Sequence, residues 1–251
     1  FIHGIPQAVQ TMSALANFGE SQRMGIAEVA EAARKQNDLT SDQLNQMFEK
    51  AGATLPVERR VTSIDEAIIA ADNIGYPVAL KLLSPDASHK TEVGGVKIGL
   101  SDARAVSEAI TEIEARLDGK IRIDGYLVQE MVEGLEVIVG FREDPQYGPF
   151  VVVGLGGIFV EALKDTSLRL LPASANDVKK MISELRSSRL FETFRGQPAR
   201  DVDALAQAVS ALGDLFLEHR SSLSDLEINP MIVGAEGQGI RAVDVRPIQR
   251  S

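Results

Sequence analysis

The chain has 251 residues, 44% of them apolar and 25% charged, which is enough for two domains with a sizeable core. Its formal net charge of −10 argues against a nucleic-acid backbone or an anionic membrane as its partner. The absence of cysteines excludes disulfides, thiolate catalysis and cysteine zinc sites, and with no apolar run of transmembrane length we expect a cytoplasmic protein.

The amino-terminal part has apolar residues at helical spacing in 4–18 and 26–35, followed by a polar linker. Because the chain begins with Phe1 and a new helix start follows at Ser41, we interpret residues 1–37 as the tail of a preceding module. We therefore expect the chain to be either part of a fused protein or a separate subunit.

The next stretch alternates helical and strand patterns and predicts one α+β unit. Its elements, in chain order, are a helix over 41–52, a strand over 55–61, a helix over 63–75, strands over 76–83 and 94–100, and a helix over 102–117. The last helix has one apolar face, formed by Val106, Ala109, Ile110, Ile113 and Leu117.

The rest of the chain predicts an antiparallel sheet backed by helices, again an α+β arrangement. A buried strand near 150–155 enters a glycine-rich turn, and two helices follow near 175–189 and 202–220. The final strands, 225–233 and 240–248, are joined by the loop GAEGQG and predict a terminal hairpin.

The segment GYLVQEMVEGLEVIVGFRED has two alternating runs around a Glu-Gly pair, which is typical of a hairpin turn. It can also be a hinge between two units, with backbone groups near Glu130 and Val132 facing an adenine edge and Glu136 reaching a ribose hydroxyl. The residues alone favour the plain hairpin.

The terminal hairpin allows its register to be derived. With a loop over 234–239, Val233 pairs with Ile240, so Asn229 lies opposite Asp244 and Glu227 lies opposite Arg246. Alternation places these four polar residues on one face, with the apolar residues Ile228, Ile232, Val243 and Val245 on the other. A carboxylate and an amide oxygen directly across a strand pair can share one hard cation such as Mg²⁺. An ordinary solvated face is the alternative, and Pro230 indicates an edge or a bulge.

Two further patterns suit a bound phosphate. Lys81 lies in the apolar run VALKLL, where an ammonium group needs an anion or solvent. The turn GLGGIF contains Gly156 and Gly157 after a strand, and glycine runs can present backbone N–H groups to phosphate. A strand alternating toward solvent and a simple tight turn are the alternatives.

His89 lies between two predicted strands, next to Lys90 and shortly before the pair Gly94-Gly95. A neutral imidazole is a nucleophile that can accept a phosphoryl group, and glycines allow a loop to bend. An inconsequential surface histidine is the alternative, and His3 and His219 are interpreted in that way.

Together these segments resemble the ATP-grasp portion of NDP-forming acyl-CoA synthetases, the group with ADP-forming acetyl-CoA synthetase and, more distantly, the succinyl-CoA synthetase β subunit. The matching runs are IGYPVALKLLSPDASHKTEVGGVKIGL, VQEMVEGLEVIVG, DPQYGPFVVVGLGGIFVE, LEINPMIV and AVDVR. They occur in the order of the family and span about residues 41–248, and SPDASHKTEVGGV is the most specific of them.

The resemblance implies an ATP-grasp fold, with the nucleotide between a first subdomain at 38–127 and a second at 128–251, and with ATP or ADP and Mg²⁺ as cofactors. The implied nucleotide contacts are Lys81 at the phosphates, Gln129, Glu130, Met131 and Val132 at the adenine, and Glu136 at the ribose. Gln129 stands where many ATP-grasp proteins have Glu. The implied Mg²⁺ ligands are Asn229 and Asp244, with Glu227 beside them.

The resemblance also implies a function: His89 relays phosphate between the nucleotide and a distant site, so that acid, ATP and CoA give acyl-CoA, ADP and phosphate. CoA and the acid are expected to bind CoA-binding and CoA-ligase modules of the same polypeptide or of a partner subunit, in an oligomer. An ATP-binding regulatory module and a carboxylate–amine ligase on the same fold are the alternatives. The retained His89 favours phosphoryl transfer.

Overall fold

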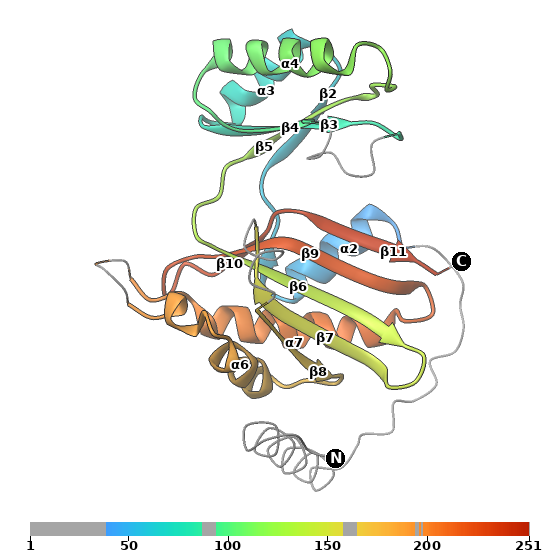
Figure 1. Cartoon of the computed structure of the whole chain (residues 1–251), viewed down its shortest axis with the longest axis vertical. Helices are drawn as coiled ribbons and strands as arrows, with labels where there is room; N and C mark the ends of the chain where they lie inside the picture. The colour runs from blue at the N-terminus through green and yellow to red at the C-terminus, as the bar shows by residue number, and fades with distance from the viewer. Residues whose placement is uncertain (1–38, 87–93, 158–164, 194–195, 197, 251) are drawn as a thin grey trace, which may run out of the picture. The chain divides into compact units, whose positions relative to one another are not determined.

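The computed structural model of the chain contains two sheets, each packed against helices, which confirms the α+β class (Figure 1). The residues that it describes are 39–86, 94–157, 165–193, 196 and 198–250. The predicted tail at 1–37 and the candidate histidine His89 lie outside these residues. In the described ranges, no helix combines the length and the apolar character needed to cross a bilayer.

The first sheet has four antiparallel strands in the order β2-β5-β3-β4. Its strands are β2 (Glu58–Val61), β3 (Val78–Leu83), β4 (Val96–Leu100) and β5 (Gly125–Glu130). Helices α3 (Ile64–Ile74) and α4 (Ala103–Leu117) cover one face (Figure 1). All five residues of the predicted apolar face of α4 are buried, so its helical periodicity is confirmed.

The second sheet has seven strands, six in the order β1-β10-β9-β6-β7-β8, with β11 also pairing with β9. Its strands are β1 (Ala53–Thr54), β6 (Leu135–Asp144), β7 (Gly148–Leu155), β8 (Thr166–Leu170), β9 (Leu223–Val233), β10 (Ile240–Ala242) and β11 (Val245–Gln249). The helical segments that complete it are α2 (Ser41–Lys50), α6 (Ala175–Glu184), η1 (Ser188–Phe191) and α7 (Val202–Glu218). All pairings are antiparallel except that of β1 with β10.

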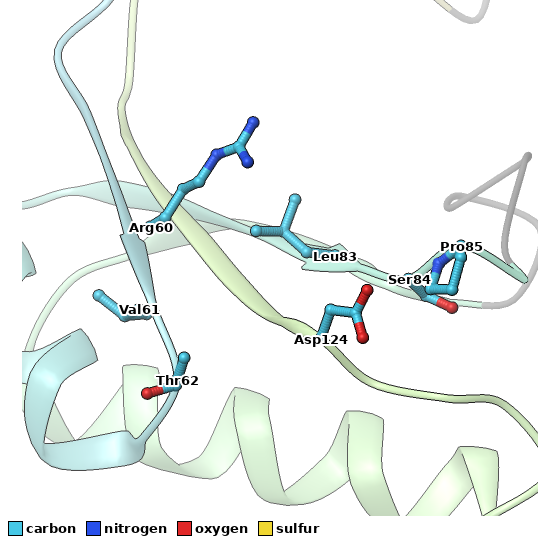
Figure 2. A pocket seen from close by; sticks show the side chains of 7 residues that line it. All are labelled: Arg60, Val61, Thr62, Leu83, Ser84, Pro85 and Asp124. Carbon is cyan, nitrogen blue, oxygen red and sulfur yellow. The ribbon is translucent and has the colours of Figure 1, made fainter.

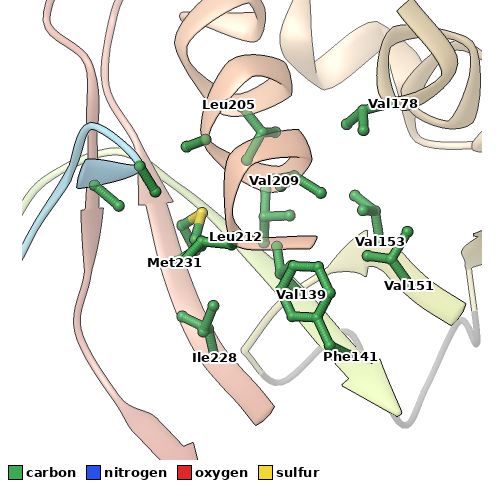
Figure 3. Packing of buried hydrophobic residues seen from close by; sticks show 14 of the residues in the cluster. Val139, Phe141, Val151, Val153, Val178, Leu205, Val209, Leu212, Ile228 and Met231 are labelled. Atoms are coloured by element: carbon green, nitrogen blue, oxygen red, sulfur yellow. The ribbon is translucent and has the colours of Figure 1, made fainter. Parts of the chain in front are cut away.

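The core of the second sheet lies between its strands and α7 (Figure 3). Leu205, Val209 and Leu212 of α7 are at most 1% exposed and belong to the same cluster as Val139 and Ile228 of the sheet. The rings of Phe141 and Phe216 stack with their centroids 5.8 Å apart, which adds a preferred aromatic contact to the buried area.

The division between the two sheets differs from the predicted subdomain ranges at the amino-terminal end. Met47 and Phe48 of α2 and Ala53 of β1 are buried in the core of the seven-stranded sheet. Residues 39–54 therefore pack with the carboxy-terminal part of the chain and not, as predicted, with the first subdomain. The helix itself is as predicted, except that Thr40 and not Ser41 is its N-cap, in a capping box with Gln43.

The predicted hairpin around Glu133-Gly134 is wrong, and the segment links two units, as the hinge alternative expected. The adenine and ribose contacts of that alternative stay predictions. Strand β5 pairs with β2 and β3 of the first sheet, whereas β6 pairs with β7 and β9 of the second. The segment between them links the two sheets. Gly134 has φ 159°, and a Cβ there would lie 2.5 Å from the carbonyl oxygen of Val233, so the link requires glycine at this position.

The register of the terminal strands is confirmed, because Val233 pairs with Ile240 and Glu227 with Arg246. The predicted faces hold only in part. The β6–β9 ladder shifts register between Val137 and Val139, and the core side of β9 changes from Leu226 and Ile228 to Met231 and Val233. Ile232 is buried outside that core, and Val243 is half-buried. The bulge indicated by Pro230 explains this change of phase.

Asp201 anchors the loop that precedes β10 to the start of α7. Its carboxylate accepts the N–H of Ala204 at 3.0 Å as the N-cap, and those of Gly237 and Gly239 at 3.0 Å each. The Ala204 N–H is the largest influence and lowers the pKa of Asp201, burial opposes it, and the two glycine N–H groups lower it further.

We expect Asp201→Ala to reduce the free energy of unfolding at pH 7 by about 2–4 kcal/mol, because a cap and two part-buried hydrogen bonds are lost. Asp203→Ala is the matched control in the same helical turn. Its carboxylate pairs with Lys179 at an exposed site, so that change should cost less than about 1 kcal/mol. Urea unfolding of the three proteins measures both effects, and equal losses would contradict the anchoring role.

The same carboxylate predicts a pH dependence. Because the pKa of Asp201 is lower in the folded than in the unfolded chain, its stabilisation is complete above the unfolded pKa. It is lost as the pH falls through the folded pKa. The difference in unfolding free energy between wild type and Asp201→Ala should therefore be constant from pH 7 to 5 and shrink below about pH 4. A difference that grows on acidification would contradict this assignment.

Candidate functional site

Two predicted site residues from different sheets meet in the structure. The Nζ atom of Lys81, on β3, lies 3.9 Å from Oδ2 of Asp244, between β10 and β11. The Lys81 side chain is only 12% exposed, whereas that of Asp244 is 63% exposed. Leu80 and Leu82 point into the helix-covered core, so strand alternation puts Lys81 on the opposite face of the sheet. A little-exposed cation of one sheet thus lies close to an acid next to the other sheet, and their roles toward phosphate and metal stay predictions.

A second cation, which sequence analysis did not single out, lies in the same row as Lys81. Leu127 on β5 pairs with Arg60 on β2 and with Lys81 on β3, so the three side chains share one sheet face. Val61, the next residue after Arg60, is buried on the helix side. The alternation in VERRV predicts that Arg60 and Val61 lie on opposite faces of a strand. That Arg60 shares a face with Lys81 becomes clear only once the strand order is known.

The predicted ribose acid and the glycine-rich turn are also neighbours. The N–H of Gly156 donates to the carbonyl oxygen of Glu136 at 2.8 Å, and a Cβ on Gly156 would lie 2.9 Å from the Val137 backbone. Gly157 has φ 62°, and a Cβ there would lie 1.9 Å from the Glu136 carboxylate. Close packing against backbone therefore requires glycine at 156, whereas the positive φ favours glycine at 157. Because the Gly156 N–H is occupied within the chain, the turn alternative explains that residue better than an exposed donor does.

The four predicted hinge residues lie at the end of β5 and in the link that follows. Gln129 is 2% exposed, and its carboxamide donates to Glu58 and to the carbonyl oxygen of Val243. The Glu130 carboxylate accepts from Arg241 Nη1 at 3.4 Å. Met131 and Val132 are half-buried and belong to neither strand. Gln129 and Glu130 thus reach residues of the seven-stranded sheet from a strand of the other sheet.

The oxygen donors near Asp244 fit a magnesium ion. The Asn229 N–H donates to the Asp244 carbonyl oxygen at 2.9 Å, so these residues lie directly across the ladder as predicted. Glu227 comes before Asn229 on β9, where it is exposed. In the described part of the chain no group of three or more His, Cys, Asp or Glu side chains is arranged to hold a metal. Two acids and an amide suffice for Mg²⁺, because it keeps most of its coordination for water and phosphate oxygens.

A cavity of about 490 Å³ lies at the ends of β2 and β3 (Figure 2). It is lined by Arg60, Val61, Thr62, Leu83, Ser84, Pro85 and Asp124. Arg60 and Leu83 project to the side of the sheet away from the helices (Figure 2). Among the residues that the structure describes, none of the predicted site residues lines this cavity. We place the candidate site at Lys81 and Asp244, because a little-exposed cation and an acid from different sheets lie close together there.

His89 belongs to the connection between β3 and β4, as predicted. These strands are antiparallel neighbours, and the N–H of Leu82 donates to the carbonyl oxygen of Gly95 at 2.7 Å. His89 itself lies outside the described residues, so its role stays a prediction. The strand that leads into its connection is the one that carries Lys81.

Comparison with known proteins agrees with this arrangement. A family model described as an ATP-grasp domain matches residues 30–248. The chain is 36% identical over 226 residues to the β subunit of ADP-forming acetate–CoA ligase I of Pyrococcus furiosus, covering 88% of this chain and 96% of that subunit. It is 40% identical over 190 residues to ADP-forming acetate–CoA ligase I of Archaeoglobus fulgidus, covering 74% of this chain. The match spans only 27% of that longer relative.

A solved structure shows the same fold. It is acetyl-coenzyme A synthetase 1 of Candidatus Korarchaeum cryptofilum with coenzyme A and Mg-AMPPCP, with its phosphohistidine segment pointing towards the nucleotide binding site. It superimposes with a TM-score of 0.68 at 35% identity and covers 84% of this chain and 92% of that one. The chain described here therefore belongs to the ATP-grasp family, in the group that contains the β subunits of ADP-forming acetate–CoA ligases.

Proposed function

We propose that this chain is the nucleotide-binding part of an ADP-forming acyl-CoA synthetase. The observation that carries the proposal is the approach of Lys81, on one sheet, to Asp244, on the other. A cation and an acid that face each other across two sheets are suited to a Mg-nucleotide, because the cation attracts phosphate oxygens and the acid attracts the metal. The family relatives support this function, since each named above is an ADP-forming ligase or an acetyl-CoA synthetase.

Different residues of the chain bind different parts of the nucleotide. Lys81 binds phosphate oxygens, the backbone of the segment from Gln129 to Val132 faces the adenine, and Glu136 reaches the ribose. Asn229 and Asp244 hold Mg²⁺, with Glu227 beside them. Mg²⁺ held by these residues would supply positive charge that offsets the charge of the phosphate oxygens.

His89 accepts the γ-phosphoryl group. Its ring nitrogen forms the N–P bond as the bond from the γ-phosphorus to the β–γ bridging oxygen breaks, and ADP leaves with that oxygen. Lys81 stabilises the charge that develops on the phosphate oxygens. The phosphohistidine then carries the group to a CoA-binding module, where it activates the carboxylic acid.

CoA and the acid bind outside this chain, on CoA-binding and CoA-ligase modules of the same polypeptide or of a partner subunit. Both arrangements occur among the relatives, because the match covers 96% of a separate β subunit but only 27% of a longer ligase. Those modules select the carboxylic acid substrate, since the residues assigned in this chain bind only the nucleotide and the metal.

Calorimetry with ADP tests the proposal. We expect a saturable site for Mg-ADP, and we expect Asp244→Ala to weaken Mg-ADP binding by about tenfold or more while leaving ADP binding in EDTA unchanged. The matched control is Glu236→Ala, because Glu236 is an exposed acid in the loop before β10. Folded wild-type protein that binds no nucleotide at millimolar concentration would refute the proposed function.

A further inference from the structure

The carboxamide of Gln129 has a fixed orientation in a buried position between the two sheets. Its Nε2 donates to Oε2 of Glu58 at 2.8 Å and to the carbonyl oxygen of Val243 at 3.2 Å. Both partners are acceptors only, so a flipped amide would place its carbonyl oxygen against two other oxygens. The Oε1 atom consequently faces away from them, and it has no hydrogen-bond partner among the described residues.

The Val243 bond acts on the residue that follows, Asp244. Residues 243 and 244 form the short link between β10 and β11, and β9 holds one side of it through Val243 N–H to Pro230 O at 3.1 Å and Asn229 N–H to Asp244 O at 2.9 Å. Those two bonds leave the Val243 carbonyl oxygen free. Gln129 binds that oxygen from the other sheet and so fixes the link on its second side.

The neighbouring residue strengthens this connection. The Glu130 carboxylate accepts the Val57 N–H at 3.1 Å and Arg241 Nη1 at 3.4 Å, and Arg241 lies on β10. Two consecutive side chains of β5 therefore contact the segment that carries Asp244. Strand β5 also pairs with β3, where Leu127 lies opposite Lys81. Lys81 is therefore connected to Asp244 in two ways: through β5 and Val243, and directly by the approach of their side chains to 3.9 Å.

We propose that Gln129 is a positioning residue that sets the carboxylate of Asp244 relative to Lys81 through its bond to Val243. This inference rests on the proposed function, because it gives Gln129 a role toward the metal of a bound nucleotide. The role differs from the base contact that the family resemblance implies for this residue. Here the carboxamide is already committed to two protein acceptors and acts on the metal side of the site.

A pair of exchanged side chains separates positioning from simple stabilisation. Gln129→Glu loses both donations and places two carboxylates together, so it should lower both the melting temperature and the affinity for Mg-ADP. In the double variant Gln129→Glu with Glu58→Gln, the hydrogen bond between residues 58 and 129 is restored with its direction reversed, because residue 58 is now the donor. The Val243 carbonyl oxygen still lacks its donor. Glu58→Gln alone is the matched control, since Gln129 keeps its bond to Val243.

The readouts are the melting temperature and the ratio of ADP dissociation constants without and with Mg²⁺. We expect the double variant to recover most of the melting temperature lost in Gln129→Glu, while its Mg²⁺-dependent gain in affinity stays at least about fivefold below that of wild type. Glu58→Gln should keep the full gain. If the double variant does not fold, Gln129→Met, which retains volume without a donor, should show the same loss of gain.

Two results would overturn the inference. One is a double variant, or Gln129→Met, with the wild-type gain from Mg²⁺. The other is an equal loss of affinity with Mg²⁺ and in EDTA, which would make Gln129 a direct nucleotide contact. Absence of nucleotide binding by the wild-type protein is a separate result that refutes the proposed function and this inference with it.

Discussion

Lys81→Met should weaken the binding of ADP by about 10- to 100-fold, both in EDTA and with Mg²⁺, because it removes a charge-assisted contact to phosphate from a poorly solvated position. The ammonium group lies on a side chain that is only 12% exposed, where water screens its charge weakly. Calorimetry measures the two constants. The effect differs from that of Asp244→Ala, which should act only when Mg²⁺ is present.

Lys97→Met is the matched control for Lys81→Met. Lys97 is on the neighbouring strand β4, opposite Leu80, and its Nζ lies 2.6 Å from Glu112 of α4. It therefore projects from the helix-covered face of the same sheet. We expect its replacement to leave nucleotide affinity unchanged, and an equal loss of affinity in both variants would contradict the assignment of one face to the nucleotide.

Local sequence periodicity predicted the elements in which apolar residues recur at regular spacing on the buried face. The five apolar residues of α4 recur at helical spacing, and all five are buried. The pairing of Val233 with Ile240 followed from loop length alone, since antiparallel register is fixed once the turn is known. For the same reason Asn229 was placed opposite Asp244 from the sequence.

Other features depended on contacts that the local pattern does not encode. Two alternating runs around Glu133-Gly134 fit a hairpin, but Leu135 pairs with Val233 and Glu130 pairs with Val78, so each run joins a different sheet. The apolar stripe of α2 predicted that this helix packs against a core, but it did not indicate which of the two cores. Strand β8 was missed, because its outward residues Leu168 and Leu170 are about half exposed and do not mark a buried face.

The candidate site divides in the same way. The residue patterns and the family resemblance indicated Lys81 and Asp244 as separate residues, and the contact between them depends on the order of strands in two sheets. Arg60 could be placed beside them only through its pairing with Leu127. The commitment of Gln129 to Glu58 and Val243 depends on tertiary contacts 71 and 114 residues away along the chain, beyond the reach of any sequence motif.

His89→Ala should abolish acyl-CoA formation by the full enzyme, by about 1,000-fold or more, while leaving the affinity for Mg-ADP unchanged. Removing a nucleophile that forms the covalent intermediate eliminates the pathway, and a ground-state contact contributes far less. His219→Ala is the matched control, because His219 is the C-cap of α7, remote in sequence from the relay connection. Loss of nucleotide binding together with activity would assign His89 to binding and not to transfer.

The most direct measurement is to map the phosphoryl group after mixing the protein with γ-labelled ATP and Mg²⁺ and quenching in base, which preserves a phosphohistidine. We expect label on the peptide that contains His89 in wild type and in His219→Ala, and no label in His89→Ala. Label at another residue, or a His89→Ala protein that is labelled and forms acyl-CoA at the wild-type rate, would contradict the relay. The chain would then be an ATP-grasp domain with a different task, such as nucleotide sensing or ligation to an amine.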